Sequence, residues 1–140
     1  MLRQAYILIF LLILLSCKQD SLDAQADFVS ISGTWVLKEV ETGSYGQKYW
    51  MAFAGQPSRK IIFRGDGAVL SSDSLLICCA PTSLLVNKQL LEIKPATPPA
   101  VNPLCALVNC APCPQWEIEW KRNELIILYC NGEREKYVRL

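Results

Sequence analysis

QWEIEWKRNELIILYCNGEREKYVRL, residues 115–140, is the stretch of the chain that decides its fold class. In its first third, Trp116, Ile118 and Trp120 alternate with charged residues. This period of two is typical of a β-strand that buries one face and exposes the other. The stretch therefore begins with a strand whose tryptophans point toward a core.

Two more strands are expected in the rest of this stretch. Residues 125–130 form an apolar run, and Asn131-Gly132 follows directly. Asn-Gly is strongly favoured in a two-residue hairpin turn, because both central residues need positive φ angles. Residues 133–140 then return as a partner strand, so the C-terminal part of the chain predicts consecutive antiparallel strands.

The same pattern of short β-type runs between turn residues continues upstream, and we see no convincing amphipathic helix. Gly65-Asp66-Gly67 separates two such runs and predicts another hairpin. The chain is therefore expected to be all-β, an antiparallel meander of about eight strands. Closing such a meander into a small β-barrel removes its exposed edges; an open β-sandwich is the alternative. The upstream runs include residues 36–41, 60–64, 68–72, 84–86 and 89–94.

Residues 95–114 interrupt this pattern with six prolines and three cysteines. Proline cannot donate a hydrogen bond to a sheet, so this segment is expected to be a long loop rather than a central strand. A loop of this composition needs some other means of attachment, and covalent cross-links are the expected one.

Six cysteines besides Cys17 are available for cross-links. An even number in an exported domain predicts disulfides. Adjacent cysteines do not readily bond to each other, so Cys78 and Cys79 are expected to reach different partners, in the 105–113 loop and at Cys130. The six are Cys78, Cys79, Cys105, Cys110, Cys113 and Cys130.

Three other uses of these cysteines compete with disulfides. The spacing of Cys105, Cys110 and Cys113 matches the first three ligands of a plant-type [2Fe–2S] cluster, and four thiolates also suit zinc. The pair Cys110 and Cys113 resembles a thiol-oxidoreductase motif, but no helical pattern follows to lower the thiol pKa. Structural disulfides and no cofactor are therefore expected.

The N-terminus carries an export signal. Arg3 precedes the apolar run 5–15, which is shorter than the roughly 20 residues that a membrane-spanning helix needs. Leu14-Leu15-Ser16-Cys17 resembles the lipobox, whose cysteine receives lipid after cleavage just before it. The sequence thus predicts a signal peptide (1–16), a lipidated Cys17 with a flexible tether (17–27), and a β domain (28–140).

Composition limits the possible functions. The precursor has 14 basic and 13 acidic residues, and the loss of Arg3 with the signal peptide leaves them equal. A neutral surface does not favour nucleic-acid binding. The absence of histidine removes the commonest general base and metal ligand, so no enzymatic activity is expected.

The motifs together resemble a known family. Gly33-Thr34-Trp35 is similar to the G-x-W opening of lipocalin and calycin barrels, and the whole mature chain is similar to small lipocalin-like lipoproteins of Gram-negative bacteria. The resemblance implies that Trp35 lies across the barrel floor and packs against Arg139. The 95–114 segment is not part of the general pattern. The other matching motifs are Ile61-Ile62-Phe63 with Asp66-Gly67, Trp116 with Ile118, and Lys136-Tyr137-Val138-Arg139-Leu140.

The expected function follows from the signal and the barrel. The chain is expected in the cell envelope, attached by lipid on Cys17, with Lys18 in second position favouring the outer membrane. The β domain is expected to bind a small apolar ligand or an envelope protein. A structural or interaction module with a filled core is the alternative, and a thiol oxidoreductase using Cys110 and Cys113 is the least favoured.

Overall fold

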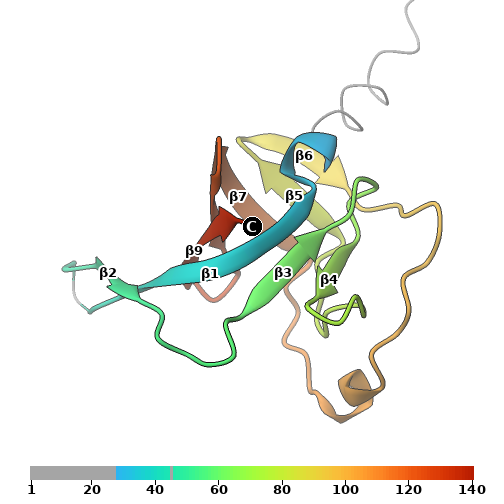
Figure 1. Ribbon diagram of the computed structural model, residues 1–140, viewed down its shortest axis with the longest axis horizontal. Coiled ribbons are helices and arrows are strands. Elements are labelled where there is room, and N and C mark those ends of the chain that lie inside the picture. The colour runs from blue at the N-terminus through green and yellow to red at the C-terminus, as the bar shows by residue number, and fades with distance from the viewer. Residues whose placement is uncertain (1–27, 45) are drawn as a thin grey trace, which may run out of the picture.

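A computed structural model describes residues 28–44 and 46–140 of the 140-residue chain. The expected signal peptide (1–16), Cys17 and its tether (17–27) lie outside the described residues. The described part is all-β, which confirms the expected class, with nine strands, one short 3-10 helix and one turn of α-helix at residues 28–31 (Figure 1). The elements are β1 Gly33–Thr42, β2 Tyr49–Ala52, β3 Lys60–Phe63, β4 Val69–Ser71, β5 Ser83–Val86, β6 Gln89–Glu92, η1 Pro103–Leu107, β7 Gln115–Lys121, β8 Glu124–Leu128 and β9 Arg134–Arg139.

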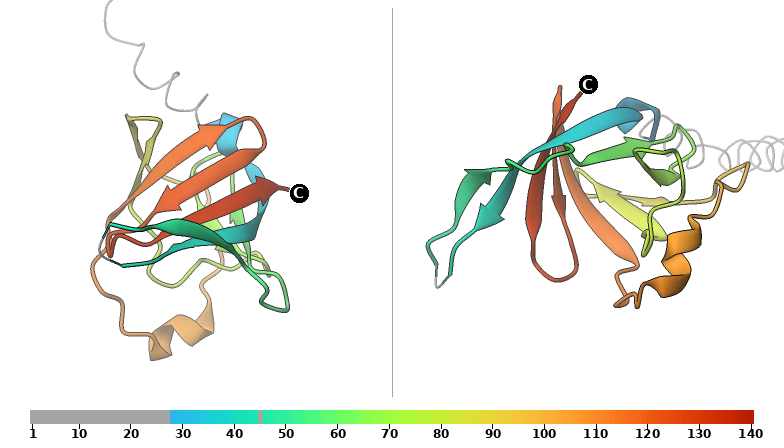
Figure 2. Two further views of the ribbon diagram at one scale, coloured as in Figure 1. Left: turned by 90° about the vertical axis from the view of Figure 1, so that its left-hand side faces the viewer. Right: turned by 60° about the horizontal axis from the view of Figure 1, so that its bottom comes forward.

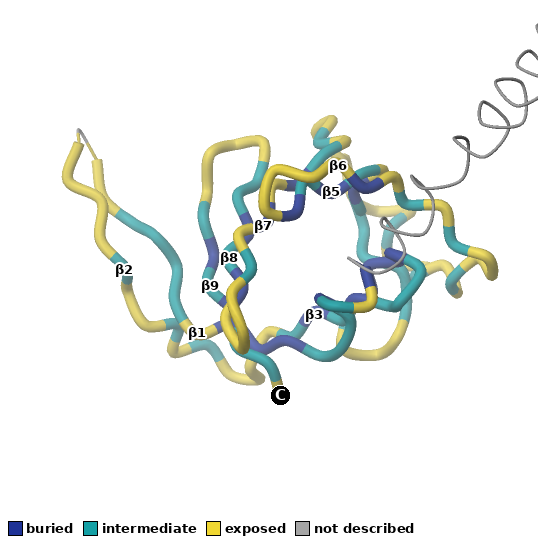
Figure 3. The backbone as a smooth tube through the Cα atoms, turned by 90° about the horizontal axis from the view of Figure 1, so that it is seen from above, coloured by how far each residue is buried: buried dark blue, intermediate teal, exposed yellow. Residues whose placement is uncertain are grey.

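The strands form a single curled sheet in the order β4-β3-β1-β9-β8-β7-β5-β6, with β2 paired to the far half of β1. Viewed from above, β3, β1, β9, β8, β7 and β5 surround the core (Figure 3). The sheet is therefore barrel-like and not a sandwich of two sheets. Beyond the ring, β2 and the end of β1 project as a two-stranded arm (Figure 2).

One pairing departs from the expected antiparallel meander: β5 and β7 run parallel. A parallel pair needs a crossover of a dozen residues or more between its strands. Here β6 forms a hairpin with β5 on one side, and residues 95–114 carry the chain across to the other side. The proline-rich segment is thus the crossover, long enough to bring β7 beside β5.

The inner face of the sheet makes the core, and the period of two seen in the sequence explains it. Trp116 and Ile118 of β7 are buried while Glu117 and Glu119 are exposed, as expected. The same alternation operates in β3, β8 and β9. The core cluster comprises Phe28, Ile31, Trp35, Leu37, Ile61, Phe63, Val69, Leu84, Val86, Leu91, Trp116, Ile118, Leu125, Ile127 and Tyr137.

The two ends of the sheet, β4 and β6, do not pair with each other in the described structure. Residues 95–114 pass beside the β4 end. The Leu76 amide donates to the Ala100 carbonyl at 2.8 Å, and the Arg64 guanidinium donates to the Thr97 carbonyl. Where the segment reaches β7, the Thr82 amide donates to the Pro114 carbonyl at 2.8 Å. The open side is therefore bordered by irregular chain whose prolines accept but do not donate hydrogen bonds.

Candidate functional site

Trp35 and Arg139 form the closed end of the barrel. Trp35 is fully buried, and its Nε1 donates to the Ile31 carbonyl at 2.8 Å. The Arg139 guanidinium lies 4.5 Å from the centre of the Trp35 ring. It also donates to the carbonyls of Ser30 and Ser32, both at 2.7 Å. A cation over an aromatic face is attractive, so Arg139 ties the helical turn of residues 28–31 to the sheet.

Gly33 has a definite role beside this pair. Its φ is +127°, a conformation that side chains rarely adopt, and a Cβ there would lie 3.3 Å from Nη1 of Arg139. Glycine supplies both the backbone angle and the space for the guanidinium. Gly33, Trp35 and Arg139, the three residues that the family resemblance assigns to the barrel floor, thus lie together.

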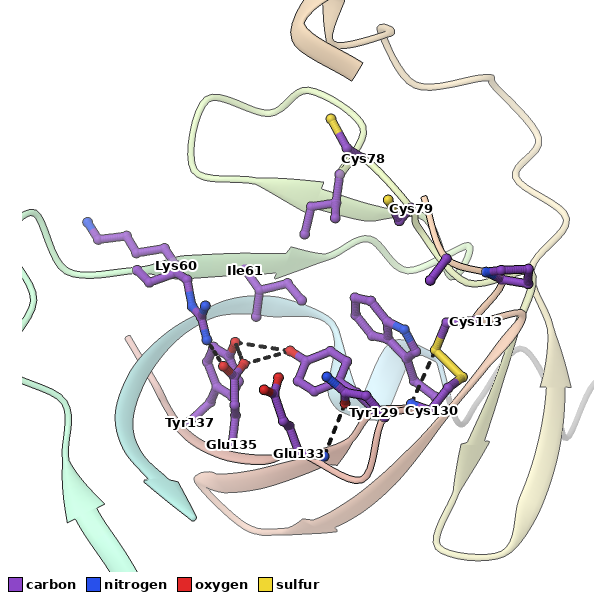
Figure 4. A pocket seen from close by; sticks show the side chains of 16 residues that line it. Lys60, Ile61, Cys78, Cys79, Cys113, Tyr129, Cys130, Glu133, Glu135 and Tyr137 are labelled. Atoms are coloured by element: carbon purple, nitrogen blue, oxygen red, sulfur yellow. Dashed lines mark hydrogen bonds and ion pairs between the residues drawn. A yellow bond between two sulfur atoms is a disulfide. The ribbon is translucent and has the colours of Figure 1, made fainter. Parts of the chain in front are cut away.

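A cavity of about 600 Å³ lies toward the other end of the barrel, where β7 begins and β9 begins. It opens to solvent and is walled by aromatic, aliphatic and disulfide side chains, with a polar group on one side (Figure 4). The lining residues are Arg59, Lys60, Ile61, Ile77, Cys78, Cys79, Ala111, Pro112, Cys113, Trp116, Tyr129, Cys130, Asn131, Glu133, Glu135 and Tyr137.

Glu135 is the centre of the polar side. Its carboxylate is buried, with the residue only 6% exposed. The hydroxyls of Tyr129 and Tyr137 donate to its Oε2 at 2.7 and 2.6 Å, and Arg59 forms an ion pair with Oε1. Burial raises the pKa of both tyrosines, so both hydroxyls keep their protons at neutral pH.

Aromatic rings form the adjoining wall. Trp116 and Tyr129 meet edge to face, with ring centres 4.9 Å apart and planes at 79°. This arrangement is favoured because the positive ring edge of one meets the negative face of the other. Two aromatic surfaces at nearly right angles thus lie beside the carboxylate.

Three disulfides are formed by the six cysteines: Cys78–Cys105, Cys79–Cys110 and Cys113–Cys130. Their Cα separations of 5.1, 5.4 and 5.5 Å are normal for disulfides. Cys78 and Cys79 reach different partners, as expected. Both partners lie in the 95–114 segment.

The expectation that Cys130 bonds to Cys78 or Cys79 is wrong. Cys130 follows β8, and Cys113 precedes β7, the antiparallel neighbour of β8. The end of one strand and the start of its neighbour are adjacent, so these two cysteines meet. Cys110 and Cys113 are not bonded to each other among the described residues, and both sulfurs of that C-x-P-C motif have other partners.

Sequence reasoning missed Glu135 and Arg59. The signal for Glu135 was present, because it lies two residues before Tyr137 on the inward face of β9. Because charged residues are expected on the outer face of a sheet, polarity predicts an exposed position for Glu135, and the register contradicts it. Arg59 lies on the loop before β3, where no period exists to indicate its direction.

Within residues 28–44 and 46–140, no group of three or more His, Cys, Asp or Glu side chains is placed to hold a metal ion. No helix in that part of the chain is long and apolar enough to cross a bilayer.

Comparison of the chain with protein-family profiles, with curated proteins and with solved structures returns no match in any of the three. The sequence motifs and the geometry of the cavity are therefore the features of this chain that bear on its function.

Proposed function

We propose that the chain is a lipid-anchored protein of the cell envelope, fixed to the outer membrane, whose β domain binds a small and largely apolar molecule. The observation that carries the proposal is the cavity at the open end of the barrel. Its volume of about 600 Å³ falls within the roughly 300–1,000 Å³ of small-molecule sites. Apolar walls with a few polar groups on one side are the usual composition of such sites.

Binding is tested with the neutral fluorescent probe N-phenyl-1-naphthylamine. All nine strands and all three disulfides lie within residues 28–140, so a secreted form of residues 18–140 without lipid keeps the whole fold. Titration of this form is expected to show saturable fluorescence enhancement. Native mass spectrometry after mild purification is expected to show a bound small molecule.

A blocking variant makes the test specific to the cavity. Ala111 is exposed and lines the cavity, so Ala111→Trp fills the opening without changing the core. It is expected to abolish probe binding. Ala106→Trp is the matched control, because Ala106 is equally exposed in the same segment but does not line the cavity. Equal binding by both variants would contradict the proposal.

The anchor is tested separately at Cys17. Cys17→Ala is expected to give an unprocessed or soluble form that incorporates no radiolabelled palmitate, because the sulfur that accepts lipid is gone. Several acyl chains on one residue give lasting attachment, whereas a single chain is reversible. Normal membrane partition and labelling of Cys17→Ala would sink the lipoprotein assignment.

A second candidate function, a protein-interaction module, is favoured by the surface of the 95–114 segment. Val101, Leu104 and Leu107 are 72%, 64% and 85% exposed. Exposed aliphatic side chains held by disulfides are a plausible contact surface for a protein. On this alternative, the cavity variants leave function unchanged, whereas Leu104→Ser with Leu107→Ser removes it.

A further inference from the structure

The charge of Glu135 is compensated by a residue that can leave. Within the described residues, its cationic partner is Arg59, whose side chain is 51% exposed and belongs to the loop between β2 and β3. The guanidinium also lies 5.7 Å from the centre of the Phe53 ring. Arg59 makes both contacts in one conformation while half of its side chain already faces water, so the guanidinium can exchange Glu135 for solvent without leaving a buried site.

Two tyrosine hydroxyls lie beside Glu135, 3.3 Å from each other, and both are within hydrogen-bond distance of its carboxylate. Tyr129 and Tyr137 direct their only protons to Oε2 of Glu135. A tyrosine hydroxyl that has donated its proton still has lone pairs to offer. The polar side of the cavity is thus a carboxylate with two phenol oxygens, which together suit a positive or proton-donating group.

The aromatic wall has the same preference. The faces of Trp116 and Tyr129 carry negative charge density, and both residues line the cavity beside Glu135 (Figure 4). Aromatic faces at an angle to one another form the cages that bind alkylammonium groups in proteins. Glu133 adds a second carboxylate to the lining, whereas Lys60 extends away from the cluster (Figure 4).

We propose that the cavity binds an organic ammonium ion, whose nitrogen takes the place of Arg59 at Glu135 while its alkyl body packs against Ile61 and Ile77. This inference rests on the proposed small-molecule function and narrows it to one chemical class. An anionic headgroup is disfavoured there, because it would face the carboxylate of Glu135 at low dielectric.

The test compares three probes with the same alkyl chain and different heads. Decylammonium, decanol and decanoate are titrated calorimetrically into the secreted form of residues 18–140, at neutral pH and below their critical micelle concentrations. Decylammonium is expected to bind at least about tenfold more tightly than decanol. The reason is that its ammonium group is attracted to the aromatic faces, whereas the hydroxyl of decanol carries no charge. Decanoate is expected to bind most weakly.

Two variants and a control separate the contributions. Glu135→Gln is expected to remove the preference for decylammonium and leave decanol binding unchanged. Arg59→Gln is expected to increase the affinity for decylammonium, because the cation that competes for Glu135 is gone. Arg59 lies on an exposed loop, so this variant folds even if Glu135→Gln does not. Glu117→Gln, on the exposed face of β7, is the matched control and is expected to change nothing.

The outcomes distinguish this inference from the proposed function. If decanoate binds most tightly and Arg59→Gln abolishes that binding, the inference is overturned while small-molecule binding stands. Equal affinities for all three probes would also overturn the inference alone. If neither these probes nor N-phenyl-1-naphthylamine bind, the proposed function fails as well.

Discussion

Arg139 satisfies two backbone carbonyls and covers an aromatic ring with a single side chain. The carbonyls belong to the turn before β1, and the ring belongs to Trp35 within β1. A lysine would place one point charge where the planar guanidinium forms two directed bonds and a stacked contact. At this scale, one residue connects the last strand to the first.

Trp35→Ala is expected to lower the free energy of unfolding by about 3–5 kcal/mol, the usual cost of truncating a buried large aromatic. The loss combines the cavity left in the core with the missing support for Arg139. Denaturant unfolding monitored by circular dichroism measures it. Trp50→Ala is the control, because Trp50 lies on the projecting arm and is partly exposed. If Trp35→Ala lowers the free energy of unfolding by less than about 1 kcal/mol, Trp35 is not the floor of the core.

Tyr129 and Tyr137 are expected to make the folded state sensitive to alkaline pH. Burial raises their pKa values above the ordinary value of about 10. Above about pH 10 the unfolded chain therefore loses these protons first, and the free energy of unfolding falls as the pH rises. Below that pH the contribution is fully present.

The measurement is the stability of the chain toward denaturant as a function of alkaline pH. Tyr137→Phe, which cannot ionise, is expected to show a shallower decline than the parent chain. An identical decline in both would show that this phenol does not control the alkaline loss of stability.

The sequence predicts the position of a residue where the residue belongs to a recognisable motif. It fails for a charged residue that the fold buries. Gly33 and Trp35 stand in a spacing that resembles a known strand opening, so their place could be anticipated. Glu135 is a buried carboxylate, and its environment depends on two tyrosines and an arginine from separate elements. No local pattern contains that combination.

Among the elements, the 95–114 segment depends most on covalent attachment. Its helix η1 has no buried residue. Two disulfides, Cys78–Cys105 and Cys79–Cys110, join the segment to the chain between β4 and β5. Such bridges stabilise mainly by restricting the unfolded chain. The segment is therefore a crossover that is fixed by sulfur rather than by packing.

Replacing Cys79 and Cys110 together by alanine is expected to lower the free energy of unfolding by about 2–4 kcal/mol. It is also expected to expose the 95–114 segment to proteolysis, because only Cys78–Cys105 would then attach its middle. Limited proteolysis with mass spectrometry locates the cuts. The control replaces Cys113 and Cys130 by alanine and keeps both disulfides that attach the middle of the segment. If the control is cleaved within residues 95–114 earlier than the Cys79 and Cys110 variant, these two disulfides are not what fixes the segment.

The turn residues predict where most strands begin and end, but they do not predict that β7 lies beside β5. Asn87 and Lys88 have φ angles of +47° and +74°, and Val86 pairs with Gln89 across them. Such a two-residue turn is local, so the sequence indicates it. The parallel pairing of β5 with β7 depends on the path of residues 95–114 through space, and no period or turn residue specifies that path.

At the scale of the whole molecule, the two termini of the β domain meet at one end and the cavity opens toward the other. Phe28 and Ile31 pack into the core near Trp35, and the Leu140 amide donates to the Thr34 carbonyl at 2.9 Å. Phe28, at which the described β domain begins, and the cavity thus lie toward opposite ends of the barrel.

The pairing of β1 with β9 also determines when this protein can fold. Trp35 pairs with Arg139, and Val40 pairs with Glu135, so the middle of the sheet joins the first strand to be synthesised with the last. Contacts between such distant parts of a chain close late and make folding slow. Until β9 has emerged from the ribosome, β1 lacks the longest of its three partner strands, β2, β3 and β9. The order of strands therefore makes the sheet close after β9 has been synthesised rather than during synthesis.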